Sequence, residues 1–474
     1  MTDFLYNQLS KEIGNAIRQG VYGINERMPS LRRITQLYKV SLATAIQSYR
    51  ILEDEGLIEA RPRSGYFVKS RQIQYHAEPE TTRPSSRPTS ISVGQLALSL
   101  ISETQSEKLI KFGAAVPGEA FLPVKALSRC LAGVARRYAN KPAVYESAKG
   151  TLALRRQIAQ LMRQAGCRCT PDDIVITNGC LEALSLSLRV IAKPGDTIAI
   201  ESPTYFAVLQ VIESLGMKAL EIATHPVHGI DTEALETAVK KRNISACILM
   251  PNFHNPLGSQ MPDENKKRVA KLLGENNIPL IEDDVYGSLS YQQPRPKALK
   301  AFDKNDNVLL CSSFSKILAP GYRIGWVLSK KYNEQIEYRK FLENISTATL
   351  PQLALADFLS RGGFSRNIQQ VVPVYRHRME MMRRLISEYF PANTRISQPA
   401  GGFVLWLALA ENIDCLDLYK LAMTKQIAIS PGILFSARGE FRNHIRLSCA
   451  AVDEAQMKTA LKTLGQLIHQ FAKN

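Results

Sequence analysis

Six short, mostly apolar runs alternate with helix-like stretches in the middle of the chain, and this alternation constrains the fold more than any other feature. The runs are residues 174–176, 197–200, 246–250, 278–281, 308–311 and 325–328. Short runs separated by helical stretches are typical of an α/β domain with a mostly parallel sheet. Such sheets bind ligands at the carboxyl ends of their strands, so polar motifs that follow the runs mark the expected site.

One of these runs leads into Ser313-Phe314-Ser315-Lys316, and Arg323 follows seven residues after the lysine. A lysine forms a Schiff base with an aldehyde when its amine is deprotonated, and desolvation favours that state. Two hydroxyls and an arginine can bind a phosphate. The motif therefore predicts a ligand that is both an aldehyde and a phosphate, namely pyridoxal phosphate (PLP).

Three further motifs follow strands and suit the same cofactor. Cys180 and Leu181 open a helix, and the free N–H groups and positive end of a helix suit a phosphate. Tyr205 offers an aromatic ring for stacking, and the Asn255 amide can donate to a phenolate oxygen. Each signal is weak alone, because glycine–helix turns, packed tyrosines and Asn-Pro turns are common.

An acidic motif, Glu282-Asp283-Asp284-Val285-Tyr286, follows another run. A carboxylate at Asp283 can pair with a pyridinium N–H and so keep the ring an electron sink. Tyr286 can share the phenolate oxygen with Asn255. Carboxylates at strand ends also suit Mg²⁺, but the lysine motif favours PLP, and we predict no metal site.

The first seventy residues follow a different pattern. Apolar residues recur at helical spacing from Leu5 to Ile17, and Ser30 and Ser41 can cap two further helices. Residues 57–60 and 66–68 then resemble two short strands joined by a basic turn. Three helices and a hairpin predict a winged helix-turn-helix, whose third helix enters the major groove.

The motifs of this N-terminal part resemble the GntR family of regulators. They are Met28-Pro29-Ser30-Leu31-Arg32, residues 52–58 and Ser64-Gly65-Tyr66. The resemblance implies DNA contacts from Ser30, Arg32, Ser41, Ala43, Thr44, Arg61, Ser64 and Gly65. Leu42 departs from relatives that carry arginine there, so specificity rests more on Arg32, Thr44 and the wing. A small helical domain that binds protein is the alternative, and the element order and the arginines favour DNA.

Between the two parts lies a segment rich in proline, serine and threonine, most clearly at residues 79–90. Such a composition predicts a flexible, partly extended spacer. Residues 91–101 are more apolar, and we expect a short helix there that docks on the next domain. We therefore predict a DNA-binding domain at 1–70, a linker at 71–109 and a PLP-binding and dimerisation domain at 110–474.

Taken together in this order, the motifs of residues 110–470 resemble the fold-type-I aminotransferases. The resemblance implies that Lys316 is the Schiff-base lysine, Asp283 the pyridinium partner and Tyr205 the stacking ring. It also implies ring-oxygen contacts from Asn255 and Tyr286. The implied phosphate ligands are Ser313, Ser315, Arg323 and the amides of Cys180 and Leu181. Leu181 departs from the polar residue that is common in relatives at this position, so its side chain can add nothing to the phosphate.

Two more residues match the aminotransferase pattern. Tyr145 corresponds to a tyrosine that reaches the phosphate of the neighbouring subunit, which implies a homodimer with composite sites. Arg446, in His444-Ile-Arg-Leu-Ser448, corresponds to the arginine that grips a substrate α-carboxylate bidentately.

A GntR-type head, a proline-rich linker and an aminotransferase-like domain together resemble the MocR subfamily of GntR regulators. Residues 362–368 and 375–378 are similar to a segment typical of it, and the motifs around Lys316, Asp283 and Asn255 look most like its YdcR-type branch. The resemblance implies a transcriptional regulator that senses PLP, or an amino acid or amine, through its aminotransferase-like domain.

Two other functions remain open on the residues alone. The first is an active PLP-dependent aminotransferase that carries a DNA-binding head, because Asp283, Lys316 and Arg446 are all present. The second is an inactive PLP fold that serves as a dimer scaffold, against which the intact Lys316 and Asp283 argue. We favour the regulator.

Charge and composition agree with these expectations. The formal net charge of +17 favours a polyanionic partner such as double-stranded DNA. No apolar run approaches the roughly 20 residues needed to span a membrane. The eight cysteines are dispersed, apart from Cys167 and Cys169, so free thiols are expected and zinc is not. We expect a cytoplasmic protein.

Overall fold

The computed structural model describes residues 5–18, 21–23, 25–61, 64–69, 76–91, 109–241 and 244–471. At the N-terminus lies a small head with three helices and one hairpin. Its elements are α1 (Leu5–Arg18), α2 (Leu31–Tyr38), α3 (Leu42–Asp54), β1 (Ile58–Arg61) and β2 (Gly65–Val68), with β1 and β2 antiparallel. The predicted winged helix-turn-helix is confirmed.

The head forms because its apolar residues meet in one cluster and its helices begin at capping residues. Ile13, Ile34 and Leu52 come from the three helices and are buried together with Ile58 of the hairpin. The predicted caps are present, since the Ser30 hydroxyl accepts from the amide of Arg33 and the Ser41 hydroxyl accepts from that of Thr44.

The body is built on an eight-stranded sheet in the order β4-β11-β10-β9-β8-β5-β6-β7. The strands are β4 (Ile174–Thr177), β5 (Thr197–Ser202), β6 (Lys218–His225), β7 (Gly229–Ile230), β8 (Ala246–Leu249), β9 (Leu280–Asp283), β10 (Val308–Ser313) and β11 (Gly325–Leu328). Neighbours from β10 to β6 are parallel, whereas β11 is antiparallel to β10 and β4. All six predicted runs are strands of this sheet, and β6 and β7 are additional to the prediction.

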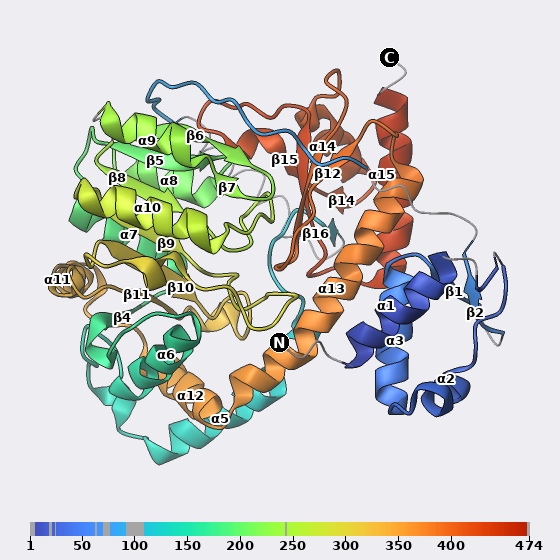
Figure 1. Ribbon diagram of the computed structural model, residues 1–474. Coiled ribbons are helices and arrows are strands. Elements are labelled where there is room, and N and C mark those ends of the chain that lie inside the picture. Colours follow the sequence, from blue (N-terminus) through green and yellow to red (C-terminus); the bar gives the residue numbers. More distant parts are fainter. Residues whose placement is uncertain are drawn as a thin grey trace.

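Helices cover both faces of the sheet (Figure 1). The core on one face contains residues of α7 (Cys180–Ile191), α8 (Phe206–Ser214) and α11 (Asn333–Asn344). The cores on the other face contain residues of α9 (Thr232–Lys240), α10 (Asp263–Glu275), α5 (Val124–Arg137), α6 (Leu152–Gln164) and α12 (Thr349–Ser360). Two-sided coverage explains why the strands are nearly continuous in apolar residues.

A smaller second lobe follows the long helix α13 (Gly363–Tyr389). It holds an antiparallel sheet of β12 (Arg395–Ile396), β13 (Val404–Ala408), β16 (His444–Ser448) and β15 (Ser430–Pro431), with α14 (Cys415–Thr424) and α15 (Glu454–Phe471). Next to it, β3 (Ile110–Lys111) pairs in parallel with β14 (Ile427–Ala428). Short 3-10 helices lie at η1 (Glu119–Phe121), η2 (Lys141–Ala143), η3 (Pro171–Asp173), η4 (Leu299–Phe302), η5 (Pro320–Tyr322) and η6 (Gly432–Phe435).

Residues 76–80 of the linker contact the small lobe, where the amide of Ile396 donates to the carbonyl of Ala77, and residues 82–89 run along the outer edge of β6. The Thr82 hydroxyl donates to the carbonyl of Ser202 at 2.7 Å. Further along, Thr89 and Ala219 exchange two backbone hydrogen bonds of 2.8 and 2.9 Å. Ile91 is buried in the core beneath the sheet, and the rest of the predicted helix at 91–101 lies outside the described residues. The described part of the spacer is extended, as predicted, but it is hydrogen-bonded to the body, which differs from the predicted flexible segment.

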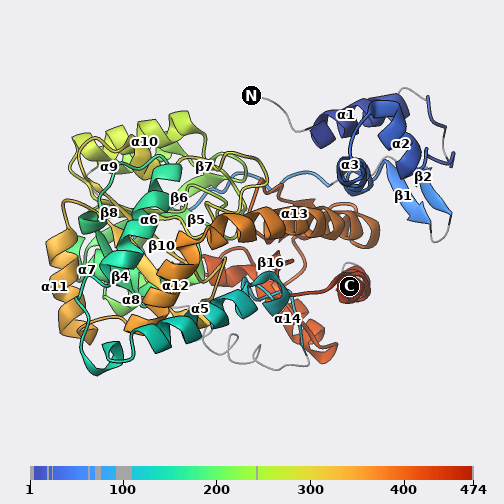
Figure 2. The ribbon, with the colours of Figure 1, turned by 90° about the horizontal axis from the view of Figure 1, so that it is seen from below.

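The head lies against α13 of the body, beside α15 (Figures 1 and 2). His377 of α13 is hydrogen-bonded through Nδ1 to the carboxylate of Asp54, at the end of α3. Arg384, two turns further along α13, donates to the carbonyl of Glu53 at 3.5 Å. Among the described helices, none is long and apolar enough to cross a membrane.

Candidate cofactor and effector site

Sheet topology brings the predicted cofactor residues to one edge. Asp283 ends β9, Ser313 ends β10, and Cys180 begins α7 directly after β4. The carboxyl ends of these strands lie together, which is the expected position for a ligand in such a sheet.

Lys316 lies just beyond the end of β10. Its Nζ donates to the carbonyl of Ala115 at 2.7 Å. Burial, and after it the charge of Arg446, lower the pKa of the Lys316 amine to about 8, although the carboxylate of Asp283 opposes the shift. A substantial fraction of the amine is therefore neutral near pH 8 and able to attack an aldehyde.

Asp283 is 3% exposed and faces this lysine's side of the sheet. Its Oδ1 accepts hydrogen bonds from the backbone of Val285 at 3.2 Å and from the thiol of Cys180 at 3.7 Å. Burial raises the pKa of this carboxyl to about 7. A cationic N–H placed against it would restore the ionised form, because an opposite charge lowers a carboxyl pKa.

The other two acids of the motif point elsewhere, because side chains alternate along a strand. Glu282 accepts from the amides of Leu299 and Lys300, and Asp284 pairs with Arg295 at 2.8 Å. The three carboxylates are thus not gathered as Mg²⁺ would require. No cluster of three His, Cys, Asp or Glu suited to a metal ion occurs in the described part of the chain.

Several buried polar atoms around this edge have no hydrogen-bond partner among the described residues. They are Oη of Tyr286, Oδ1 of Asn255, and Nε and Nη1 of Arg446. A small cavity is lined by Tyr205, Asn255 and Asp283. Burial raises the pKa of Tyr205 to about 12 and that of Tyr286 further, so both phenols stay protonated and can donate. A pyridine ring with a phenolic oxygen fits a donor set of the Tyr286 phenol and the Nδ2 group of Asn255, since Oδ1 of Asn255 can only accept.

The predicted phosphate residues cluster at the N-terminus of α7. Gly179 has φ +90°, a backbone conformation that other residues rarely adopt, and a Cβ there would also crowd the guanidinium of Arg323. Arg323 donates from Nη1 to the hydroxyl of Ser315 at 3.4 Å, and the amide of Ser315 donates to the hydroxyl of Ser313 at 3.4 Å. A helix N-terminus, an arginine and two hydroxyls suit a phosphate. The Leu181 residue is 46% exposed.

Two residues complete the set in different ways. Arg446 is 2% exposed, and its Nη2 donates to the carbonyl of Gly113 and, at 2.8 Å, to the hydroxyl of Ser430. Tyr145 lies between η2 and α6 and is 81% exposed in the single chain. Sequence reasoning missed Gly113, Ala115 and Ser430. The first two act through carbonyls, which leave no signal in the side-chain pattern.

The predicted DNA-contacting residues of the head lie on its surface. Ser41, Leu42 and Ala43 are exposed at the start of α3, with Thr44 half-buried behind them, and Arg32 is exposed on α2. Ser30 is engaged as the cap of α2.

The wing is partly held by contacts within the head. The Arg61 guanidinium contacts Oε1 of Glu59 at 2.8 Å and Oδ1 of Asn25 at 3.0 Å, and it lies over the ring of Phe67. Ser64 and Gly65 are exposed at the tip, and Gly65 has φ +96°. Pro62 and Arg63, between them, lie outside the described residues.

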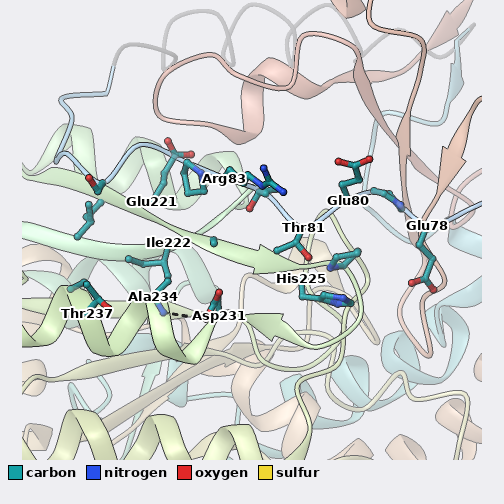
Figure 3. Close-up of a pocket in the computed structure, with 18 of the residues that line it drawn as sticks. Glu78, Glu80, Thr81, Arg83, Glu221, Ile222, His225, Asp231, Ala234 and Thr237 are labelled. Carbon is teal, nitrogen blue, oxygen red and sulfur yellow. Dashed lines mark hydrogen bonds between the residues drawn. The ribbon is translucent and has the colours of Figure 1, made fainter.

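A second hollow, of about 760 Å³, lies away from the cofactor residues, between linker residues 78–86 and the surface of β6 and α9. Figure 3 shows Thr81 and Arg83 of the linker above it and Ala234 and Thr237 of α9 below. None of the predicted site residues lines it.

Known proteins share both parts of this architecture. Residues 125–464 match the family model of the aminotransferases of class I and II, and residues 5–68 match that of the gntR family of bacterial regulatory proteins. The kynurenine aminotransferase of Pyrococcus horikoshii, solved with PMP, is structurally similar, with a TM-score of 0.74 at 28% identity. The similarity covers 82% of this chain and 95% of that one.

Similarity over the full length comes from regulators of Escherichia coli K12. YjiR, an HTH-type transcriptional regulator by name, is 37% identical over 98% of this chain and 99% of its own. YdcR, named in the same way, is 35% identical over the same shares. With a GntR-type head joined to an aminotransferase domain in one chain, the protein belongs to the class I and II aminotransferase family and, within the GntR regulators, to the MocR subfamily.

Proposed function

We propose that this protein is a PLP-dependent, DNA-binding transcriptional regulator that senses an amino acid or amine at the cofactor site. The observation that carries the proposal is the joining of the two parts. The head is capped and packed as a winged helix-turn-helix and lies on α13, while the cofactor residues gather in the same chain. The regulators YjiR and YdcR, similar over almost the whole chain, support this function.

The roles of the site residues follow from their chemistry. Asp283 would pair with the ring nitrogen, Asn255 and Tyr286 would donate to the ring oxygen, and Tyr205 would stack on the ring. Ser313, Ser315, Arg323 and the first amides of α7, from Cys180 and Leu181, hold the phosphate. When bound, PLP supplies an aldehyde for amine exchange and an electron sink. Lys316 would provide the amine that holds the aldehyde and that an effector amine would replace, and Arg446 would bind a carboxylate.

The assembly we propose is a homodimer in which Tyr145 reaches the partner's site. Its 81% exposure in the single chain leaves its ring free for that contact. We also propose that residues 1–70 bind DNA, that 71–109 link the two parts and that 110–474 bind PLP and dimerise. Two heads per dimer then engage paired half-sites.

A second function, transamination, is favoured by one observation. The charges of Arg446 and Asp283 both act on the amine of Lys316, which supports a shared set of groups for a half-reaction. The same residues suit both functions. A regulator would stop after the effector has bound at the site, whereas an enzyme would go on to complete catalytic cycles.

The deciding experiment uses the PLP-bound protein and a panel of amino acids and amines. The visible absorbance of the cofactor reports exchange, and a DNA duplex selected from a random library reports binding by the head. We expect some compounds to change both the absorbance and the DNA affinity without producing a keto acid. If a second keto acid is supplied as the amino-group acceptor, sustained production of the keto acid derived from the amino acid would establish the enzyme instead.

Two lysine variants sharpen this test. Lys316→Ala should abolish the response of DNA binding to the active compound. Lys340→Ala is the matched control, because Lys340 is a buried lysine that donates to Asn344 on the same helix, α11. A normal response in Lys316→Ala would exclude displacement of this lysine as the signal.

A further inference from the structure

Cys180, the first residue of α7, belongs to two ends of the cofactor site. Its amide lies in the N-terminal turn of the helix, among the groups that suit a phosphate. Its thiol donates to Oδ1 of Asp283, at a sulfur–oxygen distance of 3.7 Å. One residue therefore joins the phosphate turn to the carboxylate that suits a ring nitrogen.

The carboxylate of Asp283 is held through one of its two oxygens. Oδ1 accepts from the Cys180 thiol and, at 3.2 Å, from the amide of Val285. Among the residues that the structure describes, none donates to Oδ2. The carboxylate thus keeps one oxygen for a ring N–H.

The two donors to Oδ1 constrain the carboxylate in different ways. Val285 lies two residues from Asp283, so its amide fixes the carboxylate only within its own loop. Cys180 is 103 positions away, at the start of a different element. The thiol is therefore the contact that sets the carboxylate relative to the phosphate turn.

A thiol suits this place because it is a neutral donor. Asp283 is 3% exposed, and a buried acceptor costs free energy unless a donor satisfies it. A lysine or arginine in place of Cys180 would bring a charge of its own and compete with a cationic ring nitrogen. The thiol stays protonated, because burial and then the charge of Asp283 raise its pKa. It can therefore orient the carboxylate and leave the charge pairing to the ring.

A second thiol lies close to Asp283 but is engaged elsewhere. Cys311 is opposite Asp283 in the ladder between β9 and β10. Its sulfur lies 3.5 Å from the hydroxyl of Ser187 on α7, with which it forms a hydrogen bond. The side-chain contact to Oδ1 thus comes from Cys180.

We propose that Cys180 is a positioning residue for Asp283. Its thiol sets the direction of the carboxylate, so that Oδ2 would meet the ring nitrogen of a cofactor whose phosphate lies at the amide of the same residue. This inference rests on the proposed function, since it assigns a role to a further side chain of the same site. A cysteine packed there for its volume alone would leave the direction of the carboxylate to Val285.

The test compares Cys180→Val, which has no donor, with Cys180→Ser, which keeps one. Full-length protein is loaded with PLP that carries an isotope label at the ring nitrogen, and nitrogen NMR follows the protonation of this atom as the pH changes. Cys180→Val should lose the ring proton at a lower pH than the wild type, because its carboxylate is free to turn from the ring. It should also bind PLP about threefold to tenfold more weakly, the range for one neutral hydrogen bond. Cys180→Ser should restore both values.

Cys130→Val is the matched control, since Cys130 is a half-buried thiol beside Asp357, outside the cofactor residues. It should leave the titration of the ring nitrogen and the PLP affinity unchanged. A Cys180→Val protein that titrates like the wild type would overturn the proposal. Cys180→Ser that behaves like Cys180→Val would overturn it too, because the donor would then not be the cause.

A cofactor-free arm separates this inference from the proposed function. If PLP does not bind, the cofactor assignment fails, and the contact between thiol and carboxylate is still measured by alkylation of Cys180 with iodoacetamide, read by mass spectrometry. The thiolate is the reacting form, so loss of the neighbouring charge in Asp283→Asn should speed the labelling by roughly tenfold. Asp417→Asn should leave the rate unchanged. Equal rates in the two variants would show that the thiol does not face Asp283.

Discussion

The imidazole of His377 on α13 is hydrogen-bonded to the carboxylate of Asp54 at the end of helix α3. The two residues lie 323 positions apart, so this contact joins the DNA-binding head to the body. The second ring nitrogen of His377 lies 3.7 Å from Glu454 of α15. The hydrogen bond to Asp54, and then the charges of Asp54, Glu454 and Glu53, raise the histidine pKa, while burial opposes them.

Docking of the head should therefore weaken as the pH rises. A raised pKa means that the contact stabilises docking fully below the ordinary histidine value of 6.5 and is lost as the pH passes through the raised value. A double-mutant cycle with His377→Gln and Asp54→Asn should give a coupling free energy of about 0.5–1 kcal/mol at low pH. This coupling free energy, measured by thermal unfolding of the four proteins of the cycle, should vanish well above neutral pH. A coupling equal at both pH values would show that protonation plays no part.

Capture of PLP by the cofactor-free protein should depend on the Lys316 amine. Because only the neutral amine attacks, the rate should rise with pH and level off above a midpoint near 8. Arg446→Gln removes a cation that lowers this pKa and should move the midpoint upward. Absorbance after mixing measures the rate. Arg442→Gln is the control, because Arg442 is an exposed arginine paired with Asp414, and it should leave the midpoint unchanged.

Asp283→Asn should weaken PLP binding by about 10- to 100-fold, the usual range for one hydrogen bond to a charged group. The variant keeps the shape of the side chain but cannot hold a positive ring nitrogen. Equilibrium dialysis measures the affinity. Asp417→Asn, an exposed aspartate paired with Lys420 on α14, should bind PLP normally. Equal PLP affinity in the two variants would show that Asp283 does not contact the ring nitrogen.

Arg32→Ala should weaken DNA binding by ~1–3 kcal/mol if Arg32 reads a base. Arg61→Ala should have the smaller effect, because Glu59, Asn25 and Phe67 already hold that guanidinium within the head. Fluorescence anisotropy on the selected duplex compares the two at one salt concentration. An Arg61 loss greater than that of Arg32 would reverse the assigned roles.

Much of the fold could be predicted because apolar runs and caps are local signals. Ser30 and Ser41 marked two helix starts, and the six runs became strands. Strand β6 escaped prediction because Glu221 and Thr224 interrupt its apolar pattern. In the structure both are buried, and Ser202, Ser436 and Ala437 donate to the Glu221 carboxylate. A polar residue satisfied by distant partners cannot be recognised from its neighbours in sequence.

The site divides in the same way. Residues such as Lys316 and Asp283 could be named because their side chains carry the chemistry. The contacts of Ala115 and Gly113 could not, since the acceptors are carbonyls 201 and 333 positions from their donors. The docking of the linker on β6 was likewise hidden, because it depends on the backbone and on two threonines in a segment without a core of its own.

Because the linker runs along β6, it also affects the tendency of the protein to aggregate. An uncovered edge strand offers unpaired N–H and C=O groups that recruit strands from other molecules. Thr82 and Thr89 occupy this edge from within the same chain. The linker that connects the head to the body therefore also protects the edge of β6 from pairing with other molecules. An aminotransferase domain that lacks residues 76–91 should associate through this exposed edge.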